Sequence, residues 1–320
     1  MTQVASKNAL PDLIEEYMQA YFEANPVTAS GWLGLHNYDG RLPDLSRESF
    51  ARRVAELKDM QSRAEQLPPA TDKESRFDRD LLLRTIREEL YALEDSRSHE
   101  NNPMYYANLL DVSSYIKRDY APLPTRLDKL IQHLEQAPVA LAAGKEQLET
   151  ALAKPVLETS IGMYEGLISY YERDVTASVA QANSPELTAR FEAAREKAVA
   201  SLRDFIDLLT ERLPQAHFNF AIGAEKYRKM LATGEMVDLP VEKVLEVGER
   251  NLADNLREMR EVCEKIRPGA TVQEIMAEVS KHHPTAEGLV PDTRAKLEEV
   301  RQFLIDHKIV TVPSEVRCQV

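Results

Sequence analysis

The histidines of this 320-residue chain are the first candidates for chemistry, because imidazole binds metals and transfers protons near neutral pH. None of the seven lies in a His-Glu-x-x-His pattern, the helical spacing that places two imidazoles and a general base on one face. The nearest substitute is Glu278 with His282, one helical turn apart, with His283 and His307 nearby. Histidines at helix ends more often bond the last carbonyl oxygens. We therefore expect no metal ligand and no catalytic residue in this chain. An independent metal enzyme built on His282, His283 and His307 is the minor alternative.

The two cysteines and the glycines give no sign of nucleophilic or nucleotide chemistry. Cys263 falls on an apolar stripe with helical spacing, which predicts a buried and inert thiol. With Cys318 it makes too few thiols for a disulfide framework or a thiolate metal site. Gly31 and Gly34 lack the third glycine and the preceding strand of a dinucleotide-binding loop.

Polar and aromatic side chains gather between two helical patterns in the stretch from Ser30 to Ser46. These residue types could line a groove. They could equally build a structural turn, in which Asn37 or Asp39 bonds nearby backbone and Gly40 takes a positive φ. We favour the turn, and keep as candidate groove-lining residues His36, Tyr38 and Asp39.

Two later segments contribute further candidates. Arg118 and Asp119 precede a tyrosine and a proline, and an arginine beside an aspartate most often forms an ion pair that fixes a connection. Gly223 precedes a short helical pattern whose polar and aromatic residues could face a cleft, or core and solvent. The candidate groove-lining set is completed by Arg118, Tyr227 and Arg228.

The composition excludes several classes of protein. A chain of 320 residues with 43% hydrophobic residues can bury a sizeable core. The net charge of −13 opposes binding to nucleic acid, which needs clustered lysine and arginine. No apolar run approaches the roughly 20 residues that span a bilayer, and the start lacks the pattern of a secretory signal. We expect a cytoplasmic protein without a membrane or nucleic-acid partner.

The elements that must position these residues are predicted to be amphipathic helices, because apolar residues recur at intervals of three and four. Ser46 is expected to cap one helix, and Thr71 with Glu74 has the spacing of a capping box. Two stripes, 157–179 and 187–209, predict an antiparallel helical hairpin. The fold class is therefore all-α, a large irregular bundle of long helices and antiparallel hairpins.

The end of the chain departs from the helical pattern. Residues 309–312 are β-branched, and Val316, Cys318 and Val320 alternate with polar residues in the period of a strand. We therefore predict one helical domain over residues 1–308 and a strand-like tail over 309–320. A disordered terminus is the other interpretation.

Four segments occur in the order and spacing of a known family: GLHNYDGRLPDLS from Gly34, NNPMYY from Asn101, RDYAPL from Arg118 and FAIGAEKYRKML from Phe220. They extend over most of the chain, which resembles the bacterial domain of unknown function 885 family. The resemblance implies a mostly α-helical protein related to zinc metallopeptidases, whose zinc-binding motif lies in a C-terminal half. It therefore implies zinc for the full-length family and no cofactor in this chain.

The resemblance leads us to expect a truncated chain: the N-terminal, noncatalytic portion of a zinc-dependent peptidase-like hydrolase. Residues 309–320 would lead into the catalytic half. This portion would contribute walls of a substrate groove, with a peptide substrate and a C-terminal catalytic half, or its equivalent, as partners. The alternative is a stand-alone helical binding or scaffold protein without enzymatic activity.

Overall fold

The computed structural model describes residues 9–69, 72–318 and 320, which form two compact units, Met1–Asp238 and Leu239–Val320. Helix makes up 74% of the structure and strand 1%, so the predicted all-α fold is confirmed. We refer to the units as unit 1 and unit 2. The predicted boundary at residue 308 stays a prediction, whereas the compact units meet in sequence between Asp238 and Leu239.

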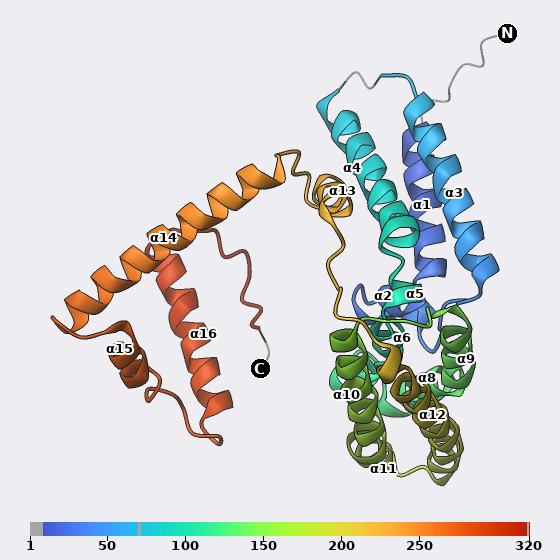
Figure 1. The fold of residues 1–320 in the computed structure, drawn as a ribbon. Helices are drawn as coiled ribbons and strands as arrows, with labels where there is room; N and C mark the ends of the chain where they lie inside the picture. The colour runs from blue at the N-terminus through green and yellow to red at the C-terminus, as the bar shows by residue number, and fades with distance from the viewer. Residues whose placement is uncertain (1–8, 70–71, 319) are drawn as a thin grey trace. The chain divides into compact units, whose positions relative to one another are not determined.

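Unit 1 begins with three packed helices, α1 (Ala9–Ala24), α3 (Arg47–Gln66) and α4 (Lys73–Leu90) (Figure 1). Their apolar stripes meet in one cluster of buried side chains because each stripe follows the helical period. The cluster includes Tyr17 of α1, Leu57 and Met60 of α3, and Ile86 of α4.

Side-chain caps define where two of these helices start. Ser46 accepts a hydrogen bond from the Ser49 amide at 3.1 Å, as predicted for α3. The proposed cap Thr71 lies outside the described residues. The described cap of α4 is Asp72, whose carboxylate accepts from the Ser75 amide at 2.8 Å.

A chain of short elements connects this bundle to the rest of unit 1. Helix α2 (Pro26–Gly31) and the 3-10 turn η1 (His36–Tyr38) follow α1. The π-helical turn η2 (Tyr91–Ser96) continues α4. Next come α5 (Ser98–Asn101), α6 (Met104–Leu109), α7 (Ser113–Lys117), α8 (Leu123–Glu135) and α9 (Ala137–Gln147).

A helical hairpin packs against α8 and α9 (Figure 1). Its first arm comprises α10 (Lys154–Tyr170), the π-helical turn η3 (Tyr171–Val175) and α11 (Thr176–Ala180). Its second arm is α12 (Pro185–Arg212). The predicted hairpin is therefore confirmed, with the π-helical turn in its first arm. Unit 1 continues with η4 (Leu213–Gln215) and α13 (Ala224–Gly234). Helix α13 packs on α4 and η2.

Buried tyrosines join the hairpin core to the connections that cross it. Tyr164 donates to the carbonyl oxygen of Pro103 at 2.7 Å, and Tyr171 donates to that of Leu110 at 2.5 Å. Phe205 of α12 lies with its ring centroid 5.0 Å from that of Tyr164. These bonds satisfy carbonyl groups that burial would otherwise leave without a partner, and so fix the connections around α6.

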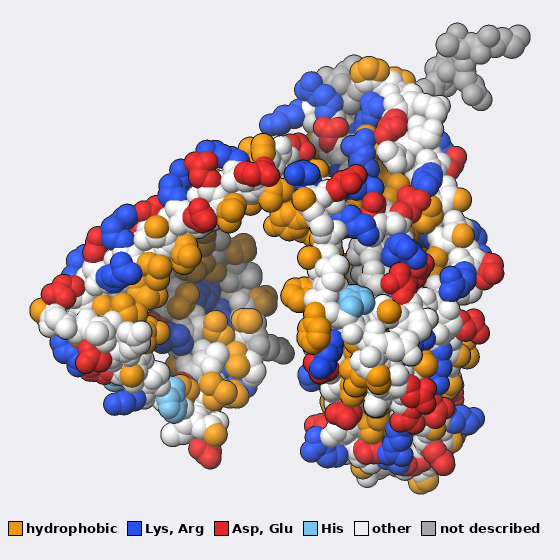
Figure 2. Space-filling model, in the orientation of Figure 1, with side chains coloured by type: hydrophobic (Ala, Val, Ile, Leu, Met, Phe, Trp, Pro, Cys, Tyr) orange, Lys and Arg blue, Asp and Glu red, His pale blue; other side chains and the backbone are white. Residues whose placement is uncertain are grey.

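Unit 2 contains α14 (Val241–Ile266), α15 (Val272–Val279) and α16 (Leu289–Asp306). A capping box starts α15, because the side chains of Thr271 and Glu274 bond each other's backbone amides. Among the residues that the structure describes here, only Cys263 and Ile275 are buried apolar side chains. Figure 2 shows apolar side chains gathered along the face of α14 in view.

The predicted tail strand is wrong for the described residues 309–318, which form irregular backbone. A strand needs a neighbouring strand edge to pair with its backbone, and the surroundings of the tail are helical. Side chains hold it instead: Arg301 of α16 donates to the carbonyl oxygen of Ser314 at 3.1 Å and pairs with Glu315 at 3.1 Å.

Candidate functional site

The loop from Ser30 to Ser46 is fixed against α8 through Gly40. The φ of Gly40 is +77°, and an added Cβ would lie 3.0 Å from the carbonyl oxygen of Lys129. Its amide donates to the Tyr115 hydroxyl at 2.9 Å, and its carbonyl accepts from the Gln136 amide group at 2.5 Å. The predicted structural turn with a positive φ at Gly40 is confirmed.

The buried carboxylate of Asp39 contacts three side chains. A hydrogen bond to nearby backbone was expected instead. The carboxylate accepts hydrogen bonds from the Ser30 hydroxyl and, at 2.8 Å, from the Tyr120 hydroxyl. Its third neighbour is His36, whose Nδ1 lies 3.3 Å away. The His36 ring stacks on Tyr120 at a centroid distance of 3.5 Å. A carboxylate that holds one imidazole nitrogen orients the ring for bonding through the other.

Tyr38, the third candidate of this loop, points into the interior. Its side chain is buried, with its ring centroid 6.0 Å from that of Phe22 and the Arg41 guanidinium 5.2 Å from its centroid. The residue therefore serves packing, whereas His36 is exposed beside it.

Arg118 lies next to the same loop, because its guanidinium donates to the carbonyl oxygen of Gly31. The prediction that Arg118 pairs with Asp119 is wrong. Asp119 pairs with Arg126 at 2.9 Å instead. The backbone of Arg118 is extended, with φ −105° and ψ 131°, and successive side chains of an extended chain point to opposite sides.

The structure does not bring Tyr227 and Arg228 to this loop. Both lie on α13, which is anchored to η2: Lys226 donates to the carbonyl oxygen of Asp95 at 3.1 Å, and its own carbonyl accepts from Tyr91 at 3.1 Å. Tyr227 is half-buried and Arg228 is exposed. The six candidates thus divide into four near α2 and two on α13.

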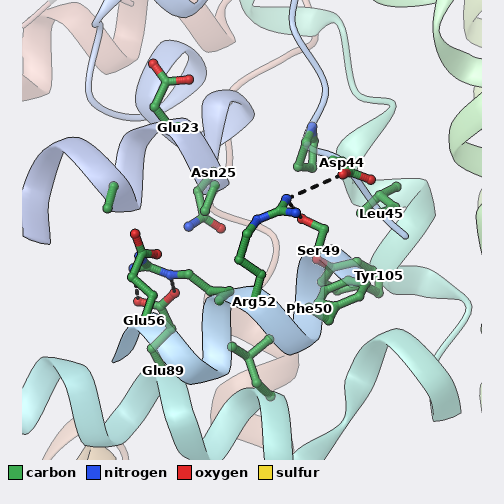
Figure 3. A pocket seen from close by; sticks show the side chains of 15 residues that line it. Glu23, Asn25, Asp44, Leu45, Ser49, Phe50, Arg52, Glu56, Glu89 and Tyr105 are labelled. Atoms are coloured by element: carbon green, nitrogen blue, oxygen red, sulfur yellow. Dashed lines mark hydrogen bonds and ion pairs between the residues drawn. The ribbon is translucent and has the colours of Figure 1, made fainter. Parts of the chain in front are cut away.

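A pocket of about 390 Å³ opens between the end of α1, the start of α3 and the end of α4 (Figure 3). One wall is aromatic, from Phe50 and Tyr105. The opposite side carries Glu23 and Asn25. Arg52 reaches across the pocket and lies 3.6 Å from the Asp44 carboxylate, with most of its side chain exposed. We call this cavity the α1–α3 pocket. It offers an apolar surface beside charged groups, which suits a ligand with both characters.

A buried ion pair closes the inner end of the α1–α3 pocket. Arg53 bonds both carboxylate oxygens of Glu89, at 2.7 and 2.9 Å, and pairs with Glu56 at 2.7 Å. Burial disfavours the Arg53 charge, but the bonds to these carboxylates outweigh it and raise its pKa. Burial and the Glu89 charge raise the pKa of Tyr17, which donates to Glu89 at 3.1 Å. This end of the pocket is therefore a rigid, bidentate charge pair.

His99 supports the aromatic wall from behind. Its ring stacks on Phe50 at a centroid distance of 4.1 Å. Burial, aided by the positive charges of Arg97 and Arg47, lowers the pKa of His99 to about 4. The imidazole is therefore neutral at neutral pH and acts as an aromatic packing group.

No motif in the sequence identifies the residues of the α1–α3 pocket as a site. A signal was present, because Arg53 falls between Phe50, Val54 and Leu57 of the apolar stripe on α3. A charged residue on an apolar face needs a buried partner. The partner Glu89 is far away in sequence and could not be named from spacing.

Within the described part of the chain, no group of three or more His, Cys, Asp or Glu side chains could hold a metal ion. His307 bonds the carbonyl oxygen of Phe303 at 3.0 Å, as expected for a helix-end histidine. Within the described residues, no helix combines the length and apolar character needed to cross a bilayer.

The fold defines an all-α protein of two helical units. Residues 26–320 match the family described as "Bacterial protein of unknown function (DUF885)", and the chain belongs to this family. A solved structure from Shewanella oneidensis, described as "a putative lipoprotein of unknown function", is similar with a TM-score of 0.73 and 18% sequence identity. The similarity covers 96% of this chain and 59% of that one. No curated protein matches the chain.

Proposed function

We propose that residues 1–320 form the helical, noncatalytic portion of a zinc-dependent peptidase-like hydrolase and supply a wall of its substrate groove. The main support for a substrate groove is the α1–α3 pocket, in which an aromatic wall faces charged side chains. A peptide presents apolar side chains beside polar backbone, and the pocket offers a surface for each. The similar solved structure is longer than the part this chain matches, since the similarity covers 59% of it, which is compatible with a further part in the full-length protein.

In this proposal, the zinc ligands and the general base belong to polypeptide outside residues 1–320. The contribution of this chain is binding. Arg52 is suited to hold a peptide carbonyl or carboxylate, because its guanidinium is exposed and its ion pair with Asp44 is long, at 3.6 Å. The Arg53–Glu89 pair keeps the pocket open by fixing α3 to α4.

Peptide binding and hydrolysis test this proposal together. We expect a fluorescent peptide library to bind the purified, zinc-supplied chain without being cleaved. Arg52→Gln should weaken binding about fivefold, which is the contribution of one exposed charged contact. Arg76→Gln, an exposed arginine on α4, is the matched control and should change nothing.

Two results would contradict the proposal. Cleavage of peptides by this chain alone would exclude a noncatalytic role. Equal peptide affinities of the Arg52→Gln and Arg76→Gln variants would show that the α1–α3 pocket does not bind the peptide.

A stand-alone binding or scaffold protein is the second candidate, and unit 2 favours it. Leu245, Leu252 and Leu256 of α14 leave 61%, 60% and 42% of their surface exposed. Exposed apolar faces are one of the features that mark sites for binding another protein. The catalytic half proposed above would be one such partner. Size-exclusion chromatography with light scattering distinguishes a scaffold protein from a part of a hydrolase by the mass of the complex that forms. A scaffold protein would form a stable complex with a protein that has no zinc motif.

A further inference from the structure

A second pocket, of about 310 Å³, lies between α2, α7 and α8. We call it the α2–α7 pocket. Its mouth carries Trp32, the single tryptophan of the chain, with 81% of its surface exposed. Tryptophan is among the most strongly buried side chains on average. An indole exposed at the rim of a cavity is therefore available to stack on a ligand.

Two cations share this mouth. Lys117 and Arg118 are exposed lining residues, and within the described residues neither forms an ion pair with a carboxylate. Arg118 donates one bond to the carbonyl oxygen of Gly31, the residue that precedes Trp32, which holds its guanidinium at the C-terminal end of α2. Its remaining N–H groups can bind a ligand.

The carboxylate of Asp111, which also lines the α2–α7 pocket, is hydrogen-bonded within the protein. The Asp111 carboxylate accepts from the amide of Ser113 at 2.8 Å and from its hydroxyl at 3.1 Å. The floor is uncharged at neutral pH, because burial lowers the pKa of His133 to about 4 and raises the pKa of Tyr115 to about 12. The lining therefore carries a local excess of positive charge on a chain whose net charge is −13.

We propose that the α2–α7 pocket binds the carboxylate of a peptide that also carries an apolar or aromatic side chain. The carboxylate bonds Arg118 and Lys117, and the side chain stacks on Trp32. This inference rests on the proposed function in taking a peptide as the ligand. It names the chemistry that the peptide must have.

Trp32 makes the test direct, because burial of the only indole shifts its fluorescence emission to shorter wavelength. The probes are acetyl-dialanyl-phenylalanine with a free carboxylate, the same peptide as its C-terminal amide, and an amidated analogue with an internal aspartate. We expect saturable binding of the free acid with a blue shift, and binding of the first amide at least fivefold weaker. Binding of the aspartate analogue as tight as the free acid would identify an acidic side chain as the source of the carboxylate.

Substitutions of single cations test whether the peptide binds in the α2–α7 pocket. Lys117→Gln should weaken binding of the free acid about fivefold, whereas Lys197→Gln on α12 removes the same charge from an exposed position and should change nothing. Arg118→Gln should weaken it further, with circular dichroism as the check on folding.

Equal binding of acid and amide, no shift in emission at millimolar peptide, or equal affinities of the Lys117 and Lys197 variants would each overturn the inference. The readout is separate from that of the α1–α3 pocket. Loss of carboxylate-dependent binding would leave the effect of Arg52→Gln in place, so the two proposals fail independently.

Discussion

Unit 1 and unit 2 contain helices of the same amphipathic kind, yet they use their apolar faces differently. In unit 1, Phe191, Leu202 and Phe205 of α12 are fully buried. In unit 2, the equivalent stripe of α14 is largely exposed, and of the described apolar residues there only Cys263 and Ile275 are buried. Unit 1 is thus stabilised by its own core, whereas unit 2 presents an apolar surface.

An amphipathic pattern thus predicts which face of a helix is apolar, but it does not predict what covers that face. Substitutions in the two units should therefore have very different costs. The following experiments use the full chain, with urea unfolding followed by circular dichroism and hydrogen exchange to assign the effect to one unit.

The largest effect is expected in the core of the hairpin. Phe205→Ala should lower the free energy of unfolding of unit 1 by about 3–5 kcal/mol, because it leaves a cavity beside Tyr164 and Tyr106. Hydrogen exchange should accelerate in α10 and α12 and stay unchanged in α14. A loss below about 1 kcal/mol would show that this core is loosely packed, and would remove the contrast between the units.

A buried charge should be nearly as sensitive. Glu89→Gln removes the carboxylate that bonds Arg53, whose side chain is only 8% exposed, and should cost about 3 kcal/mol. The exposed pair of Lys243 and Glu246 in unit 2 is the control, and Glu246→Gln should cost less than about 0.5 kcal/mol. Similar losses for the two variants would contradict the burial of the Arg53 pair.

Acid should destabilise unit 1 through its buried histidines. His133 has a folded pKa of about 4 against an ordinary value of 6.5, so the unfolded chain binds its proton first as the pH falls. Stability should be fully present above pH 6.5 and decline towards pH 4, by up to about 3 kcal/mol for this group. His133→Gln should flatten that dependence in urea titrations at a series of pH values. An unchanged slope would show that the pKa of His133 is the same in the folded and the unfolded chain.

A smaller effect is expected at the loop that joins α2 to α3. Gly40→Ala places a Cβ 3.0 Å from the Lys129 carbonyl oxygen at a φ of +77°, and should cost about 2 kcal/mol. Gly34 also has a positive φ, but an added Cβ there would meet no atom within 4 Å. Gly34→Ala therefore separates the backbone conformation from the contact, and the two variants should differ.

The smallest effect is expected on the apolar face of unit 2. Leu252→Ala should change the free energy of unfolding by less than about 0.5 kcal/mol, because 60% of the side chain is already exposed. A cost of 2 kcal/mol or more in dilute solution would mean that this face is covered in the free chain, and the comparison between the units would fail.

Much of the helical architecture could be predicted because it depends on local patterns. The caps Ser46 and Thr271 and the prolines that bound α14 are sequence signals with a direct structural meaning. The π-helical turns are different, since Tyr171, Val175 and Val179 are spaced by four residues, which an ordinary α-helical stripe also shows. The tail shows the same limit, because a strand-like period forms a strand only where a partner edge exists.

The candidate pockets could be predicted only in part. The 30–46 loop was found because unusual residue types cluster there, and Gly40 behaves as its residue type requires. The α1–α3 pocket was missed because its parts come from three helices, and Arg53 meets Glu89 only through tertiary packing. Asp39 and Tyr120 likewise meet across 81 residues of chain.

The single β-bridge of the described residues has a mechanical consequence. The amide of Lys154 donates to the carbonyl oxygen of His217 at 2.8 Å, and the amide of His217 donates to that of Leu152 at 3.1 Å. These bonds join the two ends of the hairpin, so tension along the backbone passes across the bridge. In a chain pulled from its termini, α10 to α12 would lie outside the path of the force until these two bonds break.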